Sequence, residues 1–191
     1  RPTPSIGGVG LIKNYAQMVT MDFKRISNLV LVIGKTEGHL DQSLFARSLL
    51  DEKNGPPPEI NLFNEKNNGE TVLQLIKNNY VKSAHDVSLG GILTAISKMC
   101  IKGNKGIELN KQQYSMSDIE YFFSEDQGRY IIEINPSDFK EVAKILEKNS
   151  VHFEELGKII DKHVIINKKT KVTIDELKTY NSNWLNNYMS S

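Results

Sequence analysis

Residues 80–102 read YVKSAHDVSLGGILTAISKMCIK, and this stretch decides the fold class. Its first six residues are strand-like, and its last eleven repeat apolar residues at helical spacing. A loop that ends in two adjacent glycines joins the two parts. A strand that runs through a tight glycine turn into a helix is a building block of α/β proteins. The stretch therefore predicts a sheet covered by helices.

The same alternation extends to both sides of this stretch. Short apolar runs predict strands at residues 9–13, 29–33, 105–109, 129–134 and 151–160, and a hairpin from 163–166 and 171–173. Helical spacing with capping residues predicts helices at residues 41–50, 61–78, 117–123, 136–149 and 174–191, with Asn68 and Gly69 weakening the second. Some connections are too short for a crossover helix, so strand directions should be mixed. We expect an α/β fold, an α+β sandwich whose mixed sheet is flanked by helices, with a ferredoxin-like core over residues 105–160.

The composition is that of a globular chain, with 191 residues, 39% hydrophobic and 25% charged. We expect one domain over residues 1–191, in which 174–191 form a C-terminal helix and tail. Because the sequence opens at Arg1 in a Pro/Gly-rich stretch, we expect a fragment whose residues 1–14 lead in from a missing upstream part.

The charge balance argues against two classes of partner. There are 24 basic and 23 acidic residues, a net charge of +1, so no global field attracts nucleic acid or an anionic membrane. No apolar run is long enough to span a membrane. The lone cysteine forms no disulfide within the chain, and a cytoplasmic location is the simplest expectation.

No residue of the sequence is predicted to be catalytic or to bind a metal. Cys100 lies on the apolar helix face with Ile92, Ile96 and Met99 and is predicted to be a core thiol. The four histidines lack zinc-ligand spacing and a visible triad, so they are predicted to make structural hydrogen bonds; they are His39, His85, His152 and His163. Trp184 is predicted to be a packing anchor in the last helix.

The loop at residues 86–91 is a candidate anion site. Adjacent glycines at a helix start expose backbone N–H groups at the positive helix end, which suits phosphate. Ser88 would cap the helix, and Asp86 would bind a hydroxyl or a metal-bridged phosphate. A structural explanation is equally supported: Gly90 and Gly91 would let helix and strand pack closely, and Asp86 would satisfy loop amides.

The turn at residues 124–129 gathers a second set of polar groups. Glu125, Asp126, Gln127 and Arg129 supply two carboxylates, an amide and a guanidinium, which suit ribose, phosphate or amide recognition. A solvated turn would have the same composition. The residues alone leave both explanations open.

Five stretches together resemble one protein family. They are PTPSIGGVGL at 2–11, IGKTEGH at 33–39, PPEINL at 57–62 leading into EKNNG at 65–69, SAHDVS with two glycines at 83–91, and FSEDQGR at 123–129. In this order they are similar to the C-terminal domain of phosphoribosylformylglycinamidine synthase large subunits, members of the aminoimidazole ribonucleotide synthetase superfamily. The resemblance covers residues 2 to about 130, and beyond that point it is one of layout.

The resemblance implies a fold and a parent enzyme. Such large subunits have two pseudo-symmetric halves, each a dimerising subdomain followed by an α/β subdomain. They use ATP and Mg²⁺ to convert formylglycinamide ribonucleotide and glutamine-derived ammonia to the amidine. The catalytic histidine and the ATP and Mg²⁺ contacts lie upstream, so this chain would be inactive alone. The implied partners are the missing N-terminal subdomains, a glutaminase subunit and a small bridging subunit.

The resemblance also implies cleft residues. The glycine loops, including Gly7 and Gly8 as well as residues 86–91, would line a nucleotide cleft. The turn with Glu125, Asp126, Gln127 and Arg129 would reach the cleft by analogy with the first half of such enzymes. Two departures weaken this, because Leu89 stands where the family has an acidic residue and Asp41 where it has a glycine.

Two alternatives remain open. The chain could belong to another superfamily member, such as aminoimidazole ribonucleotide synthetase, selenophosphate synthetase, thiamine-phosphate kinase or a hydrogenase-maturation protein. The stretches PPEINL and SEDQGR count against that assignment. The second alternative is a structural interaction module that binds no ligand.

Overall fold

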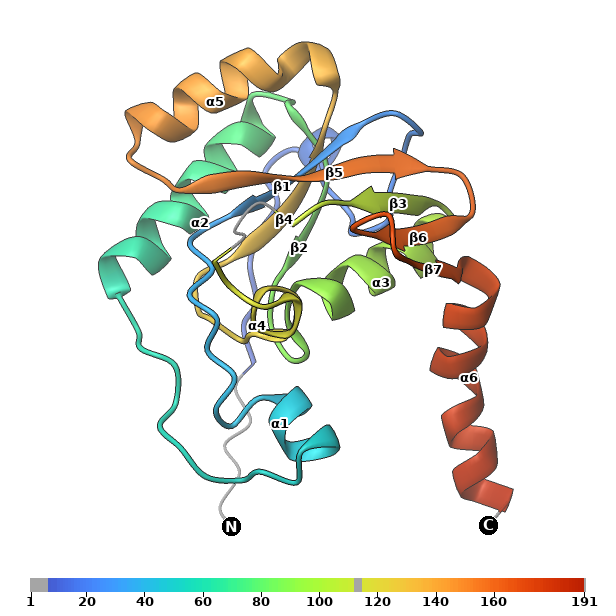
Figure 1. Ribbon diagram of the computed structural model, residues 1–191. Helices are drawn as coiled ribbons and strands as arrows, with labels where there is room; N and C mark the ends of the chain where they lie inside the picture. The colour runs from blue at the N-terminus through green and yellow to red at the C-terminus, as the bar shows by residue number, and fades with distance from the viewer. Residues whose placement is uncertain (1–6, 112–114, 191) are drawn as a thin grey trace.

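The computed structural model describes residues 7–111 and 115–190, and its centre is one seven-stranded sheet (Figure 1). The strands lie in the order β2-β4-β1-β5-β3-β6-β7. In chain order they are β1 (Leu29–Ile33), β2 (Val81–Asp86), β3 (Gly106–Leu109), β4 (Tyr130–Ile134), β5 (Phe153–Ile160), β6 (His163–Ile166) and β7 (Thr170–Thr173). Strands β3 and β6 pair in parallel and the other named pairs are antiparallel, so the predicted mixed sheet is confirmed.

Helices cover both faces of the sheet. The α-helices are α1 (Leu44–Leu49), α2 (Leu62–Lys77), α3 (Gly91–Gly103), α4 (Asp118–Phe123), α5 (Phe139–Lys148) and α6 (Ile174–Ser190), and the short 3-10 helices are η1 (Tyr15–Gln17) and η2 (Pro136–Asp138). Figure 1 shows α2 and α5 together on one face and α3 on the other. The layers are therefore helix, sheet, helix.

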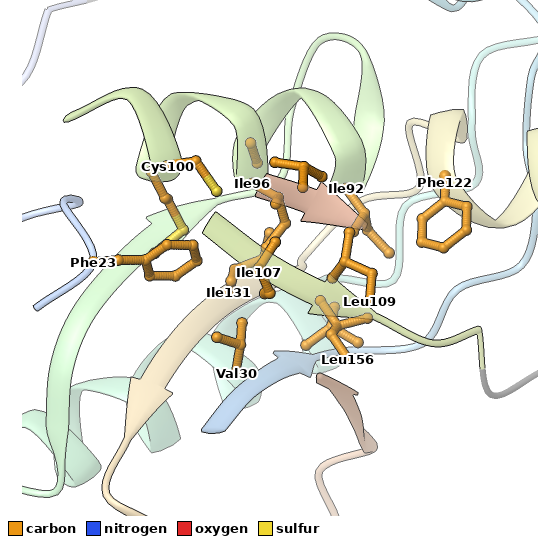
Figure 2. Close-up of a cluster of buried hydrophobic side chains, with 14 of the residues drawn as sticks. Phe23, Val30, Ile92, Ile96, Cys100, Ile107, Leu109, Phe122, Ile131 and Leu156 are labelled. Atoms are coloured by element: carbon orange, nitrogen blue, oxygen red, sulfur yellow. The ribbon is translucent and has the colours of Figure 1, made fainter. Parts of the chain in front are cut away.

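Alternation along β1 builds two hydrophobic cores. Leu31 and Ile33 pack with residues of α2 and α5, whereas Val30 and Val32 pack with residues of α3 and α4. Because both faces are buried, the strand is apolar throughout. Figure 2 shows the second of these cores, where Cys100 is fully buried as predicted. Burial raises the pKa of the Cys100 thiol well above its ordinary value, so the thiol stays protonated.

The ferredoxin-like core is present, but its predicted location was wrong. The antiparallel strands β2-β4-β1-β5, with α2 and α5 on one face, have that arrangement. The segment α3-β3-α4 is inserted between β2 and β4, and β3 pairs outside the core with β5 and β6. The core therefore spans residues 29–160 rather than 105–160, because strands far apart in the sequence pair at its centre.

Two local predictions were also wrong. Residues 9–13 form no strand, since Val9 and Leu11 are fully exposed and no described strand pairs with them. Trp184 is 64% exposed and does not anchor the described core. The predicted helix at residues 61–78 is confirmed as α2, and it continues through Asn68, whose side-chain amide donates to the Gly128 carbonyl at 2.9 Å. That tertiary contact compensates for poor helix propensity.

A buried carboxylate ties the segment before β1 to the sheet. Glu133 on β4 accepts hydrogen bonds from the backbone N–H groups of Lys24 and Arg25, at 2.8 and 3.0 Å. It also accepts from the Asn28 amide at 2.7 Å and the Ser83 hydroxyl at 2.8 Å. Four donors explain how a fully buried acidic side chain is tolerated.

Candidate functional site

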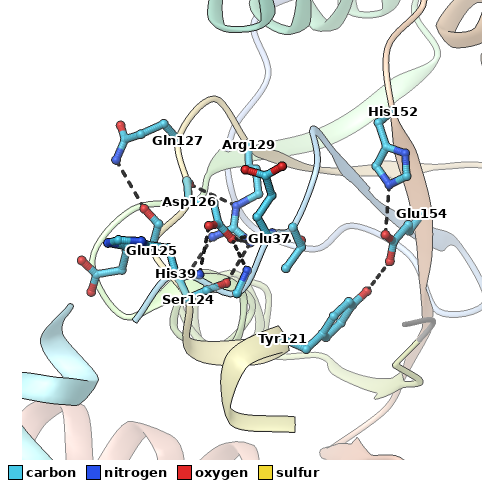
Figure 3. A network of polar contacts seen from close by, with 12 residues as sticks. Glu37, His39, Tyr121, Ser124, Glu125, Asp126, Gln127, Arg129, His152 and Glu154 are labelled. Carbon is cyan, nitrogen blue, oxygen red and sulfur yellow. Dashed lines mark hydrogen bonds and ion pairs between the residues drawn. The ribbon is translucent and has the colours of Figure 1, made fainter. Parts of the chain in front are cut away.

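Three loops meet at one end of the sheet, and Figure 3 shows side chains from the first and the third of them. The β-ladder places Ile33, at the end of β1, and Asp86, at the end of β2, on either side of Tyr130, which begins β4. The loops at residues 34–43, 87–90 and 124–129 therefore leave the sheet side by side. These loops contain most of the site residues predicted from the sequence.

Asp126 is held by the backbone of the first loop. Its carboxylate accepts hydrogen bonds from the backbone N–H groups of Glu37, Gly38 and His39, at 2.9, 3.1 and 3.1 Å. The side chain is 8% exposed. The Asp126 carboxylate thus occupies the three N–H groups that the first loop presents. Asp126 is therefore not part of a solvated turn.

Arg129 is fully buried beside Asp126. Its Nη1 lies 3.6 Å from Asp126 Oδ2, and its Nη2 donates to the Ser124 carbonyl at 2.7 Å. Nη1 also donates to the Thr36 hydroxyl at 3.1 Å. Burial lowers the pKa of the Arg129 guanidinium, and the neighbouring carboxylate of Asp126 opposes that shift. The pair joins the first and third loops and positions the residues between them.

Glu125 occupies the start of two helices. Its Oε1 accepts from the backbone N–H of Gly90 at 2.8 Å and from that of Leu44 at 2.7 Å. Gly90 is the N-cap residue of α3, and Leu44 is the first residue of α1. A helix start attracts negative charge, and here the protein supplies it from its own side chain. A phosphate at the Gly90 amide would have to displace this carboxylate.

The glycine loop itself is built for close packing. Gly90 and Gly91 have φ values of 80° and 68°, and a Cβ on Gly91 would lie 2.6 Å from the Ser124 carbonyl oxygen. The predicted cap by the Ser88 hydroxyl was wrong, because α3 has no side-chain cap hydrogen bond and the Ser88 carbonyl accepts from Gly91 at 3.0 Å. The structural explanation of Gly91 is therefore supported.

Asp86, the last residue of β2, has an accessible carboxylate beside the second loop. Its side chain is 63% exposed and lies 2.9 Å from Nδ1 of His85. It lines a cavity of about 340 Å³ together with Ser88, Glu125 and Gln127. Gly7 and Gly8 line none of the described cavities, and nothing lies within 4 Å of a Cβ built on them. The structure thus brings Asp86, but not Gly7 and Gly8, to the meeting point of the loops.

A larger cavity of about 560 Å³ lies next to the first one, and Gln127 and Glu65 line both. Its charged and amide residues are Lys35, Glu37, Asp41, Glu59, Asn61, Asn64, Glu65, Asn68, Glu120, Asp126 and Gln127. Lys35 is paired with Glu37 at 2.6 Å. The lining is mainly acidic and amide, which suits hydroxyl and amide groups better than bare phosphate.

The α2 residues of this larger cavity were not singled out from the sequence. Asn61, Asn64 and Asn68 lie at a spacing of three or four, which places them on one face of α2. Asn61 also caps that helix, accepting from the Asn64 N–H at 3.0 Å. The asparagine spacing in the NLFNEKNN run was the signal that could have found them.

The described residues do not fit a Mg²⁺ site by themselves. Within residues 7–111 and 115–190, no group of three His, Cys, Asp or Glu side chains is placed to hold a metal ion. Three histidines make hydrogen bonds: His39 to the Pro56 carbonyl at 3.1 Å, His85 to Asp86, and His152 to Glu154 at 3.0 Å.

No helix in the described ranges has both the length and the apolar character to cross a membrane.

Sequence comparisons identify close relatives. Phosphoribosylformylglycinamidine synthase subunit PurL of Pelagibacter ubique is 65% identical over 191 residues, which cover 100% of this chain and 26% of PurL. The same subunit of Azorhizobium caulinodans is 34% identical over 190 residues, with the same two coverages. The chain therefore spans about a quarter of the length of these relatives.

Solved structures share the fold. Thermotoga maritima PurL complexed with FGAR matches with a TM-score of 0.70 and 22% identity, over 85% of this chain and 30% of that protein. The same PurL complexed with ATP matches with a TM-score of 0.66 and 19% identity, over 85% and 27%. Thiamine-monophosphate kinase of Stenotrophomonas maltophilia matches with a TM-score of 0.55 and 14% identity, over 80% of this chain and 54% of that protein.

The family model described as "AIR synthase related protein, C-terminal domain" matches residues 26–168. That range contains the ferredoxin-like core and all three loops of the candidate site. The resemblance seen in the sequence is confirmed, and the chain belongs to the family of AIR synthase related C-terminal domains.

Proposed function

We propose that this chain is the C-terminal domain of a phosphoribosylformylglycinamidine synthase large subunit. The parent enzyme would convert formylglycinamide ribonucleotide, ATP and glutamine-derived ammonia to formylglycinamidine ribonucleotide. The observation that carries this proposal is 65% identity to a PurL subunit over the whole chain. Because the chain spans about a quarter of that subunit, the domain would be inactive alone.

The domain would contribute one wall of a nucleotide cleft. Asp86 and Gln127 have accessible polar groups at the two cavities and would contact ligand hydroxyl or amide groups. Asp126, Arg129 and Glu125 are bonded to their own backbone and would act as positioning residues. Ser88, Gly90 and Gly91 shape the loop between them, and a role for Gly7 and Gly8 in the cleft stays a prediction.

The groups that handle phosphate would come from the rest of the parent. The acidic lining of the larger cavity and the occupied Gly90 amide disfavour phosphate on this wall. The upstream subdomains would therefore bind ATP with Mg²⁺ and supply catalysis, in the cytoplasm. A glutaminase subunit and a small bridging subunit are the proposed partners, and a PurLQS assembly from Thermotoga maritima supports this.

A domain swap tests the parent assignment. The C-terminal quarter of the Pelagibacter ubique subunit is replaced by this chain, and ATP-dependent amidine formation is measured with ammonia. Activity near that of the unmodified subunit is expected. A folded but inactive chimera would contradict the assignment.

A second candidate function is an interaction module without a ligand. The observation that favours it is the Glu125 carboxylate at the start of α3. This carboxylate accepts the hydrogen bond of the Gly90 backbone N–H, which therefore cannot bind an external anion. Thermal unfolding of the chain at millimolar ADP or Mg-ATP tests this candidate. A saturable shift would exclude it by showing an independent nucleotide site, whereas a ligand-free module and a cleft wall that needs its other half should both show no shift.

A further inference from the structure

Helix α6 (Ile174–Ser190) is firmly fixed at its first turn. Ile174 is buried, and Leu177 packs against the core on the α3 face of the sheet. Thr173 and Glu176 form reciprocal cap hydrogen bonds of 2.7 and 3.1 Å between side chain and backbone. Lys178 donates to the Asn104 side chain at 2.6 Å, which ties the helix to the end of α3. The direction of α6 is therefore set by the core.

The rest of α6 leaves the body of the protein. Figure 1 shows it running away from the sheet beyond β7. Tyr180 is 80% exposed, Trp184 64% and Tyr188 72%. With Leu177 they follow a spacing of three or four residues, so one apolar stripe begins in the core and continues onto the exposed part. We call residues 179–190 the distal arm.

The distal arm has no charged residue. It reads TYNSNWLNNYMS, with four asparagines and no Asp, Glu, Lys or Arg. Asparagine is a weak helix former, and a helix this short is marginal in water without packing. Exposed Tyr and Trp side chains are characteristic of protein interfaces. Packing against a protein surface would therefore stabilise the arm as a helix.

The sequence of the arm argues against two occupants. A helix that lies on a membrane surface has Lys or Arg on its polar face, and this arm has neither. A coiled coil with a second copy would use charged side chains beside the apolar seam, and these are also missing.

We propose that the distal arm docks onto another domain of the same, longer polypeptide. The proposal rests on the proposed function, because about three quarters of the length of the relatives lies outside this chain. Figure 1 shows α6 and the first described residues extending on the same side of the sheet. Val9, Leu11 and Ile12 in that N-terminal segment are also exposed. A covalently linked domain on that side would meet the arm at an effective concentration in the millimolar range.

Hydrogen exchange tests the docking. The amides of residues 179–190 are followed in the full parent polypeptide and in the 191-residue chain. In the parent we expect exchange at least about 100-fold slower than in the chain, because packing protects helical amides. Equally fast exchange in both would overturn the proposal. Protection that depends on the concentration of the chain, or that arises only when separate subunits are added, would also overturn it by assigning the arm to another occupant.

A matched pair of variants sharpens the result. In the full polypeptide, Trp184→Ala should speed exchange of the arm by about 10-fold, since it removes the central aromatic of the stripe. Asn183→Ala, at the neighbouring exposed position, should leave exchange within about 2-fold of the parent. Equal effects would contradict docking through the stripe. Ligase activity of the full polypeptide is a separate readout. A protected arm in an inactive polypeptide would contradict the proposed function but would support the docking of the arm.

Discussion

Glu125 Oε1 lies 2.8 Å from the backbone nitrogen of Gly90, so the protein places its own carboxylate at the start of α3. Glu125→Ala should destabilise the chain by about 1–2 kcal/mol, because it removes hydrogen bonds to a charged group from Gly90 and Leu44. The open amides should then bind an added anion. Urea unfolding in phosphate, against chloride of equal ionic strength, should show extra stabilisation of the variant only. An equal phosphate effect on both proteins would contradict this role.

Removal of the Asp126 charge should be the most damaging change at the three loops. Asp126→Asn leaves the fully buried Arg129 guanidinium without its counter-charge, and a broken buried ion pair costs about 3–5 kcal/mol. Urea denaturation measures the loss. Gln127→Ala is the matched control, because Gln127 is exposed, and it should change stability by less than about 0.5 kcal/mol. Similar losses in the two variants would show that Asp126 does not hold the loops.

Gly91 should tolerate no side chain. At a φ of 68°, a Cβ would meet the Ser124 and Phe122 carbonyl oxygens at 2.6 and 2.7 Å, and backbone atoms cannot easily move away. Gly91→Ala should cost about 2–4 kcal/mol from strain and overpacking. Gly8→Ala is the control, since nothing lies within 4 Å of its Cβ. Thermal unfolding of both variants checks the contrast, and an unchanged melting temperature for Gly91→Ala would refute the packing.

Asp118 should make a small contribution that depends on pH. Lys111, 2.7 Å away, holds the pKa of the Asp118 carboxyl below its ordinary value of 3.8. A lowered folded pKa means that the stabilisation is complete above the ordinary value and is lost as pH falls through the folded value. Asp118→Asn should therefore cost about 0.5 kcal/mol at pH 7, since the carboxylate is largely exposed. At a pH below the folded pKa of Asp118 the two proteins should be equally stable, and a difference that persists there would point to another cause.

Local sequence signals predicted local structure well. The Ser117 and Glu120 spacing predicted a capping box, and both of its hydrogen bonds are present. The cap signal of Thr173 and Glu176 likewise marks the start of α6. Such signals act within one helical turn, so no distant contact is needed to interpret them. Residues 9–13 had the pattern of a strand, but a strand also needs a partner, and none of the described strands is placed beside them.

The candidate site was only partly predictable. The loops and their residue types were visible, but the backbone N–H groups that donate to the Asp126 carboxylate lie 87 to 89 positions away, and the donors to Glu133 lie 50 to 109 positions away. A carboxylate looks the same in a sequence whether it contacts ligand, solvent or backbone. Which of these it meets depends on how β1 and β4 pair, and the sequence pattern does not specify that pairing.

The position of β1 also determines when the protein can fold. This strand lies in the middle of the sheet, between β4 and β5, yet about 100 residues separate it from β4 along the chain. At a synthesis rate of about 5–20 residues per second, on the order of 10 s pass between the synthesis of Ile33 and that of Ile160. During that time its apolar faces have neither sheet neighbour. The newly made chain therefore passes through a long period in which the exposed apolar faces of β1 make it prone to aggregate.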